Sequence, residues 1–266
     1  MLKIKNVTKV FNRGTVNEKV ALDNFSIEIK EGEFVTVIGG NGAGKSTLMN
    51  AIAGVWKVDE GSIEIDGVDV TSYPEYKRAQ FLGRVFQDPM MGTAATMQID
   101  ENLALAKRRG EKRTLKKEIT AEEKVVYKEH LQMLDLGLED RMTTKVGLLS
   151  GGQRQAITLM MATLKKPKLL LLDEHTAALD PKTAAKVLEI TDKVVNESKL
   201  TTLMITHNMK DAITHGNRLI MLSNGKVVLD ISGEEKKNLT VKDLLDKFEQ
   251  VSGQEFADDK VMLSRS

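Results

Sequence analysis

A glycine-rich loop between a short apolar segment and a helical segment constrains this chain more than any other feature. The apolar run Phe34 to Ile38 predicts a buried strand, and the apolar spacing from Lys45 to Ala53 predicts a helix. The loop that joins them consists of Gly39, Gly40, Asn41, Gly42, Ala43, Gly44, Lys45, Ser46 and Thr47. A Gly-x4-Gly-Lys-Ser pattern at a strand-to-helix turn is typical of a phosphate-binding loop.

The residue types of this loop suit a phosphate ligand. Glycines let backbone N–H groups turn toward phosphate oxygens, and the helix N-terminus adds a favourable dipole. We expect Lys45 to reach the β and γ phosphates and the hydroxyl of Ser46 to bind Mg²⁺. ATP and Mg²⁺ are therefore the predicted cofactors, and the alternative is a glycine-rich turn that merely precedes a helix.

A second apolar strand ends in two adjacent carboxylates. Four leucines at 169–172 are followed by Asp173 and Glu174, as expected of a buried parallel strand whose end lines a nucleotide crevice. We expect Asp173 to hold Mg²⁺ through water and Glu174 to polarise the water that attacks the γ-phosphate. The alternative is a strand that simply ends at the surface.

Bulk composition excludes several function classes. The 266 residues suffice for one large core, and 39 basic against 38 acidic side chains leave a net charge of +1 with no global attraction to nucleic acid or anionic lipid. The absence of cysteine excludes disulfides and thiolate chemistry. It also fits a reducing compartment, so we expect a cytoplasmic protein. No apolar stretch approaches the roughly 20 residues that cross a bilayer, so another chain would provide any membrane part.

Strand and helix patterns alternate along the chain, which predicts an α/β core. Besides the strand before the loop, strands are expected at Leu2 to Val10, Phe25 to Lys30, Ser62 to Ile65, Gly83 to Phe86, Lys168 to Leu172 and Thr201 to Thr206. Helices are expected from Gly152 to Leu164 and from Lys182 to Asn196. Asn224-Gly225 between two apolar runs predicts a hairpin.

Two regions depart from this alternation. From Ile99 to Met142 the strand patterns vanish and apolar residues recur at helical spacing, which predicts a helical insertion. After about Leu239 the sequence predicts one amphipathic helix followed by a polar, frayed tail.

The segment Leu149-Ser150-Gly151-Gly152-Gln153 ends 20 residues before Asp173 (173 minus 153). Ser150 can cap the following helix, and Gly151 and Gly152 can bring N–H groups close to a phosphate at its N-terminus. This segment resembles the signature of the ATP-binding cassette (ABC) ATPases. Together with the loop and the acidic strand end, it makes the chain similar to that family from about Leu2 to Ile231.

The resemblance implies a fold and an assembly. The fold is an α/β P-loop NTPase core with a mixed sheet, an N-terminal antiparallel β subdomain and an inserted α-helical subdomain at about 88–165. The ATPase domain would cover 1–238, with a C-terminal helix and tail at 239–266. One nucleotide does not occupy both phosphate sites of a chain in this family. The resemblance therefore implies a head-to-tail homodimer, or a heterodimer, in which Ser150, Gly152 and Gln153 bind the other subunit's ATP.

Further positions match the family in order. Gln87 matches the glutamine that contacts Mg²⁺ or its water, and His207, 34 residues past Asp173, matches the histidine that bonds the γ-phosphate. Asp180 matches an intersubunit loop, and Phe11 is the candidate for stacking on adenine. The alternatives are ordinary polar residues at strand ends and a core aromatic.

One departure is His175, where the family more often has proline. The resemblance leaves two interpretations: a histidine near the γ-phosphate that titrates or contacts the partner subunit, or a tolerated loop variant. The variant loop resembles that of a subgroup of bacterial importers of aromatic amino acids and related solutes.

The resemblance favours the ATPase subunit of a transporter, peripheral on the inner face of the membrane, with permease subunits and a solute-binding protein as partners. A lone short cassette favours import. The alternative is a soluble cassette ATPase acting on nucleic acid or ribosomes, for which the seven basic residues within Lys107 to Lys117 are the candidate contact. The chain lacks the long coiled coil or tandem cassette of such relatives, so no nucleic acid is expected. A P-loop kinase or GTPase is a third interpretation, which the signature segment disfavours.

Overall fold

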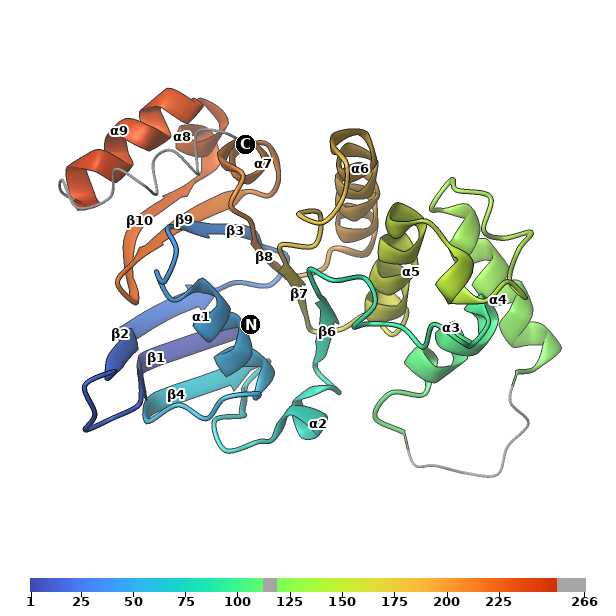
Figure 1. Cartoon of the computed structure of the whole chain (residues 1–266), viewed down its shortest axis with the longest axis horizontal. Coiled ribbons are helices and arrows are strands. Elements are labelled where there is room, and N and C mark those ends of the chain that lie inside the picture. Colours follow the sequence, from blue (N-terminus) through green and yellow to red (C-terminus); the bar gives the residue numbers. More distant parts are fainter. Residues whose placement is uncertain (112–118, 253–266) are drawn as a thin grey trace. The chain divides into compact units, whose positions relative to one another are not determined.

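A computed structural model describes residues 1–111 and 119–252 of the chain (Figure 1). The chain forms two compact units, one from Met1–Arg78 and Leu200–Ser266 and the other from Ala79–Lys199. We call them the first and the second unit. No helix in the described ranges is long and apolar enough to cross a membrane.

An antiparallel sheet opens the first unit. Its strands, in the order β2-β1-β4-β5, are β2 (Lys19–Ile29), β1 (Leu2–Phe11), β4 (Glu60–Ile65) and β5 (Val68–Asp69). β2 begins six residues before the predicted strand at Phe25. The apolar alternation breaks there because Asn24 adopts a left-handed conformation, at φ 47°, near a shift in register with β1.

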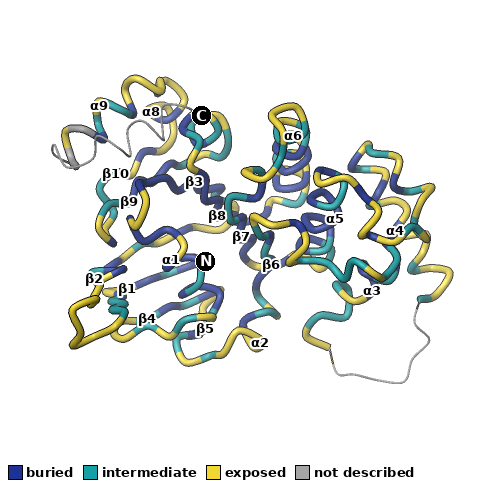
Figure 2. Tube along the Cα trace, viewed as in Figure 1, coloured by how far each residue is buried: buried dark blue, intermediate teal, exposed yellow. Residues whose placement is uncertain are grey.

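A mixed sheet forms the rest of the first unit's strand core. β3 (Phe34–Gly39) runs parallel to both β8 (Thr202–Ile205) and β9 (Arg218–Ser223), and β10 (Lys226–Ser232) pairs antiparallel with β9. All six residues of β3 are buried (Figure 2), as expected of a central parallel strand. The Asn224-Gly225 hairpin is confirmed, since both residues have positive φ, at 47° and 74°.

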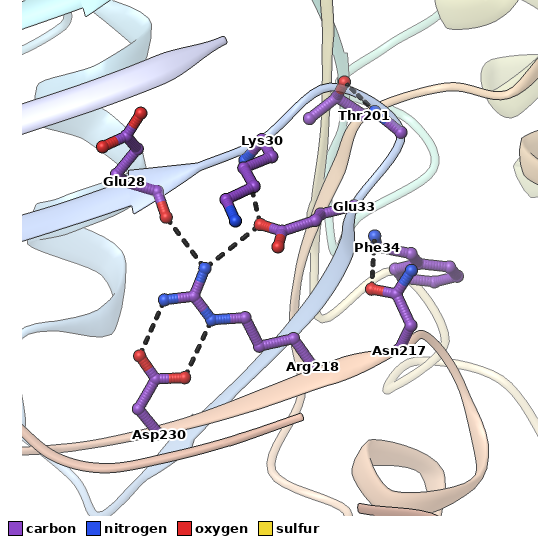
Figure 3. A network of polar contacts seen from close by, with 9 residues as sticks. Glu28, Lys30, Glu33, Phe34, Thr201, Asn217, Arg218 and Asp230 are labelled. Carbon is purple, nitrogen blue, oxygen red and sulfur yellow. Dashed lines mark hydrogen bonds and ion pairs between the residues drawn. The ribbon is translucent and has the colours of Figure 1, made fainter. Parts of the chain in front are cut away.

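An arginine joins the two sheets of the first unit at the start of β3 (Figure 3). The Arg218 guanidinium donates to both carboxylate oxygens of Asp230 at 2.8 and 2.7 Å, and to the Glu28 carbonyl at 2.8 Å. It also donates to the Glu33 carboxylate at 3.1 Å. The Asp230 hydrogen bond is the main reason that the pKa of Arg218 is raised, so the side chain is a permanent cation. This clamp fixes the strand that leads into the phosphate loop.

Five helices belong to the described part of the first unit: α1 (Lys45–Ala53), α2 (Glu75–Arg78), α7 (Met209–Thr214), α8 (Gly233–Lys237) and α9 (Val241–Ser252). α1 has the predicted bounds. α9 is the predicted amphipathic helix, and Leu244 and Phe248 bury its apolar face in a cluster with Met209 and Ile231. The short helices α7 and α8 were not predicted, because they are too brief to give a helical period. The predicted frayed tail lies outside the described residues.

The second unit pairs two parallel strands with helices. The strands are β6 (Leu82–Val85) and β7 (Leu169–Asp173), and the helices are α3 (Ile99–Lys107), α4 (Ala121–Gln132), α5 (Gly151–Thr163) and α6 (Pro181–Ser198), with a 3₁₀ turn at Val146–Leu148. The predicted helical insertion thus contains α3 and α4. Thr120 and Glu123 cap α4 reciprocally.

Candidate functional site

The phosphate loop is shaped by close packing of its backbone. Gly44 caps α1 with φ 104°, a conformation that residues with a Cβ rarely adopt. A Cβ on Gly44 would lie 2.6 Å from the carbonyl oxygen of Ala21 on β2. The loop is also tied to the β9–β10 hairpin, because the Gly225 N–H donates to the Ala43 carbonyl at 3.0 Å. Close packing of the backbone therefore restricts the path of the loop.

Lys45 lies along this loop. Its ammonium donates to the carbonyls of Gly39 at 2.7 Å and Gly40 at 3.0 Å, and the residue is buried. Ser46, the next residue, is exposed in the first turn of α1, whereas Thr47 is buried. Lys45, predicted to bind phosphate, is thus buried, whereas Ser46, whose hydroxyl is predicted to bind Mg²⁺, is accessible.

Phe11 ends β1 and lies outside the buried core. Its half-buried ring meets the Trp56 ring edge to face, with centroids 4.9 Å apart. Asp59 holds the strand end in place, accepting from the Val10 N–H at 2.7 Å and from the Lys9 ammonium at 3.2 Å. Burial alone would raise the pKa of the Asp59 carboxyl, but these hydrogen bonds and charges lower it below its ordinary value. The core interpretation of Phe11 is therefore wrong, and adenine stacking stays a prediction.

His207 is exposed just beyond β8, at the start of α7. Asn208 caps that helix by accepting from the Asp211 N–H at 3.0 Å. Burial raises the pKa of the Asp211 carboxyl, and the charges of His215, Lys210 and His207 oppose this rise only in part. The first unit thus holds His207 at an anchored helix start, next to an acidic group.

In the second unit, an ion pair holds Asp173. Arg84 on β6 donates to the Asp173 Oδ2 at 3.1 Å, and its guanidinium carbon lies 4.6 Å from the centre of the Phe86 ring. β6 and β7 run parallel with Arg84 opposite Leu171, so side chains two residues apart share a face. Sequence reasoning missed Arg84, and the available indication was a lone basic residue in an otherwise apolar strand.

Glu174 turns the chain sharply after β7. Its φ is 46°, an unusual conformation for a non-glycine residue, and its carbonyl accepts from the Ala177 N–H at 3.0 Å. Such strain costs on the order of 1–3 kcal/mol and persists only where the surrounding structure enforces it. This turn begins directly after Asp173, and the role of Glu174 in catalysis stays a prediction.

His175 points into the protein. It is 1% exposed, and its Nε2 lies 3.1 Å from the Thr191 hydroxyl oxygen on α6. Thr191 uses its one hydroxyl proton on the Val187 carbonyl at 2.8 Å, so the histidine Nε2 must carry the donated hydrogen. Of the two interpretations, a contact of His175 with a partner subunit is therefore wrong, because its imidazole is enclosed in the second unit.

The signature segment forms the predicted helix start. Ser150 Oγ accepts from the Gln153 N–H at 3.3 Å, and Gln153 Oε1 accepts from the Ser150 N–H at 3.2 Å. Ser150 and Gly151 are exposed and Gly152 is buried. Asp180 similarly caps α6 by accepting from the Thr183 N–H at 3.1 Å. The first N–H groups of α5 therefore lie at an accessible helix end that suits an anion.

Gln87 is exposed immediately after Phe86. Gln155, fully buried in α5, donates its side-chain N–H to the Phe86 carbonyl at 3.0 Å. This contact fixes the backbone ahead of Gln87 to the signature helix. Sequence reasoning missed this contact, although a glutamine on the apolar face of the predicted helix indicated that Gln155 has a buried polar partner.

Part of the predicted basic run is engaged within the second unit. Lys107 and Arg108 each lie 3.4 Å from the Glu123 carboxylate, and Arg109 donates to the Ala162 carbonyl at 3.3 Å. Residues 112–117 of the run lie outside the described residues.

Comparisons with known proteins agree with these motifs. Residues 22–177 match the family described as ABC transporter. The chain is 50% identical, over 250 residues, to a tyrosine transport ATP-binding protein of Clostridioides difficile, covering 94% of this chain and 99% of that protein. It is 33% identical to a spermidine/putrescine import ATP-binding protein of Haemophilus influenzae, covering 88% of this chain and 59% of that protein.

Solved structures share the fold. The dimeric structure of MJ0796, a bacterial ABC transporter cassette, is 32% identical with a TM-score of 0.73, covering 87% of this chain and 98% of that one. A post-hydrolysis state of the same cassette, bound to ADP and Pi, has a TM-score of 0.72 at 32% identity and the same coverage. The ADP conformation of the cassette MJ1267 has a TM-score of 0.75 at 28% identity, covering 93% and 98%. The predicted α/β P-loop fold class is confirmed.

Proposed function

The chain belongs to the ABC transporter family and is an ATPase, and we propose that two copies close around two ATP molecules to drive membrane permease subunits in solute import. One observation on this chain itself supports the proposed ATP-bound dimer. The signature helix α5 presents an accessible N-terminus, capped by Ser150, that suits a phosphate. The cassette MJ0796, which shares this fold, has been solved as a dimer.

The phosphate loop would bind the nucleotide. Phe11 stacks on adenine, and the N–H groups of Asn41, Gly42, Ala43, Gly44 and Thr47 surround the phosphates after Gly39. Lys45 neutralises the β and γ phosphates.

The residues proposed for Mg²⁺ are Ser46, Gln87 and Asp173. Among the residues that the structure describes, no group of three or more histidine or carboxylate side chains could hold a metal. Mg²⁺ bound with a nucleotide needs only one or two carboxylates beside phosphate oxygens and waters, so a single carboxylate with hydroxyl and amide oxygens fits. When bound, Mg²⁺ supplies charge neutralisation at the phosphates.

Glu174 and His207 complete the reaction. Glu174 accepts a hydrogen bond from the attacking water and polarises it. His207 donates to the γ-phosphate and stabilises its developing charge. Across the dimer, Ser150, Gly152 and Gln153 of one copy contact the γ-phosphate held by the other.

The transported solute is proposed from the relative of highest identity described above. That relative, matched along nearly its whole length, is a tyrosine transport ATP-binding protein. We extend this to import of an aromatic amino acid or related solute, with a solute-binding protein delivering it and the ATPase bound at the cytoplasmic face. In the described part of the basic run, the contacts of Lys107, Arg108 and Arg109 lie within the chain, so the nucleic-acid alternative gains no support.

The proposal is tested in cells that carry the permease genes adjacent to the gene for this chain. The chain should co-purify with the permease from detergent-solubilised membranes, and Glu174→Gln should abolish tyrosine uptake without loss of the complex. The exposed variant Glu189→Gln serves as the control. If no permease co-purifies, the transport proposal is wrong even where the purified chain hydrolyses ATP.

A further inference from the structure

Lys19 brings a cation to the tip of the phosphate loop. It opens β2 directly opposite Phe11, the last residue of β1. Its ammonium nitrogen lies 2.9 Å from the position that a Cβ on Gly42 would occupy. One lysine therefore links the strand end proposed for adenine with the loop proposed for phosphates, and all three residues belong to the first unit.

The Lys19 ammonium has no partner among the residues that the structure describes. Among residues 1–111 and 119–252 it makes no hydrogen bond and no ion pair, whereas Lys9 pairs with Asp59 and Lys3 with Glu28. Lys19 is exposed, so packing in the protein core does not explain where its side chain lies. An exposed ammonium beside a loop of backbone N–H donors adds positive charge at a place that already suits an anion.

We propose that Lys19 is a further nucleotide-binding residue, whose ammonium binds the phosphate chain on its ribose side. This inference rests on the proposed function and adds a residue to its site. The location between Phe11 and Gly42 matches the place of the phosphate nearest the ribose, because the base lies at one end and the loop at the other. Lys45 and Lys19 then neutralise opposite ends of the same chain.

Gly42 leaves the space that the Lys19 ammonium occupies. Its φ is 78°, and a side chain there would collide with the ammonium. Replacing Gly42 would therefore displace Lys19 as well as strain the loop. The absence of a side chain at Gly42 therefore allows the positive φ of the loop and leaves room for the Lys19 ammonium.

The test uses nucleotide affinities of the full chain. Trp56 is the only tryptophan and lies 4.9 Å from Phe11, so its fluorescence reports occupancy of the base. Dissociation constants for adenosine, AMP, ADP and ATP are measured for the wild type, Lys19→Met, Lys19→Arg and the exposed control Lys5→Ala. Thermal melts establish that each variant is folded. Isothermal calorimetry repeats the titrations without the optical probe.

We expect Lys19→Met to weaken AMP, ADP and ATP binding by about tenfold, as loss of one charge-assisted hydrogen bond predicts, and to leave adenosine unchanged. Lys19→Arg should restore most of this affinity, and Lys5→Ala should match the wild type. Unchanged ADP and ATP affinity in Lys19→Met, or an equal loss for adenosine, would overturn the inference. A wild type that binds no nucleotide would instead overturn the proposed function itself.

Discussion

The phosphate loop of the first unit and the acidic strand end of the second unit are built by different means. Backbone packing shapes the loop, since Gly44 lies against the Ala21 carbonyl and has no side chain of its own. Polar side chains shape the strand end, where Arg84 holds Asp173 and Thr191 holds His175. Loss of a glycine should therefore damage the first region, and loss of a polar partner the second.

The largest effect is expected from Gly44→Ala. A Cβ at this position meets the Ala21 carbonyl at 2.6 Å and is strained at φ 104°, so we expect about 3 kcal/mol of destabilisation in urea unfolding. The matched control is Gly67→Ala, because Gly67 has φ 79° but open space around its Cβ position. The control should lose only about 1 kcal/mol. Equal losses in the two variants would show that close packing does not shape the loop.

A smaller effect is expected from Arg84→Met. The substitution keeps the apolar stem of the side chain but leaves the largely buried Asp173 carboxylate without its 3.1 Å partner, which should cost about 1–2 kcal/mol in chemical unfolding. Lys128→Met removes an exposed pair with Asp140 and should cost less than about 0.5 kcal/mol. Should Arg84→Met prove as stable as the control variant, the ion pair does not organise the strand end.

The smallest effect is a pH dependence from Asp59. Its folded-state pKa is lowered, so its charge stabilises the fold above the unfolded value of about 3.9, and this stabilisation is lost as pH falls through the folded pKa. Asp59→Asn keeps an acceptor for the Val10 N–H but loses the charge. We expect it to be about 1 kcal/mol less stable than the wild type at pH 7, with the difference vanishing well below pH 4. The exposed pair variant Asp23→Asn should show neither change, and a constant Asp59→Asn deficit across pH would contradict the assignment.

The same contrast explains what could be predicted from the sequence. α1 was predicted with its observed bounds because the apolar spacing from Lys45 to Ala53 is helical, and the left-handed glycines Gly44 and Gly54 cap its two ends. The phosphate loop was predicted because its chemistry lies in consecutive residues. Arg84, in contrast, meets Asp173 only through the parallel pairing of β6 and β7, and no local pattern specifies that pairing.

Lys19 and Gln155 were missed for a related reason. The position of Lys19 beside Gly42 depends on the register of β2 against β1, which register shifts in β1 alter. The contact of Gln155 with Phe86 depends on the packing of α5 against β6. His175 was given a possible role at a subunit contact because it directly follows Glu174, which is expected near the γ-phosphate, and only the packing of α6 places it inside.

The central claim, that each nucleotide site is completed by a second copy, is tested most directly by the mass of Glu174→Gln with ATP. Sedimentation velocity should give a species of about 59 kDa, twice the 29.5 kDa chain, at saturating ATP and Mg²⁺, and the monomer with ADP. The additional substitution Ser150→Arg, at the exposed helix end, should abolish the ATP-dependent dimer. A Glu174→Gln chain that binds ATP and stays at 29.5 kDa would contradict the account.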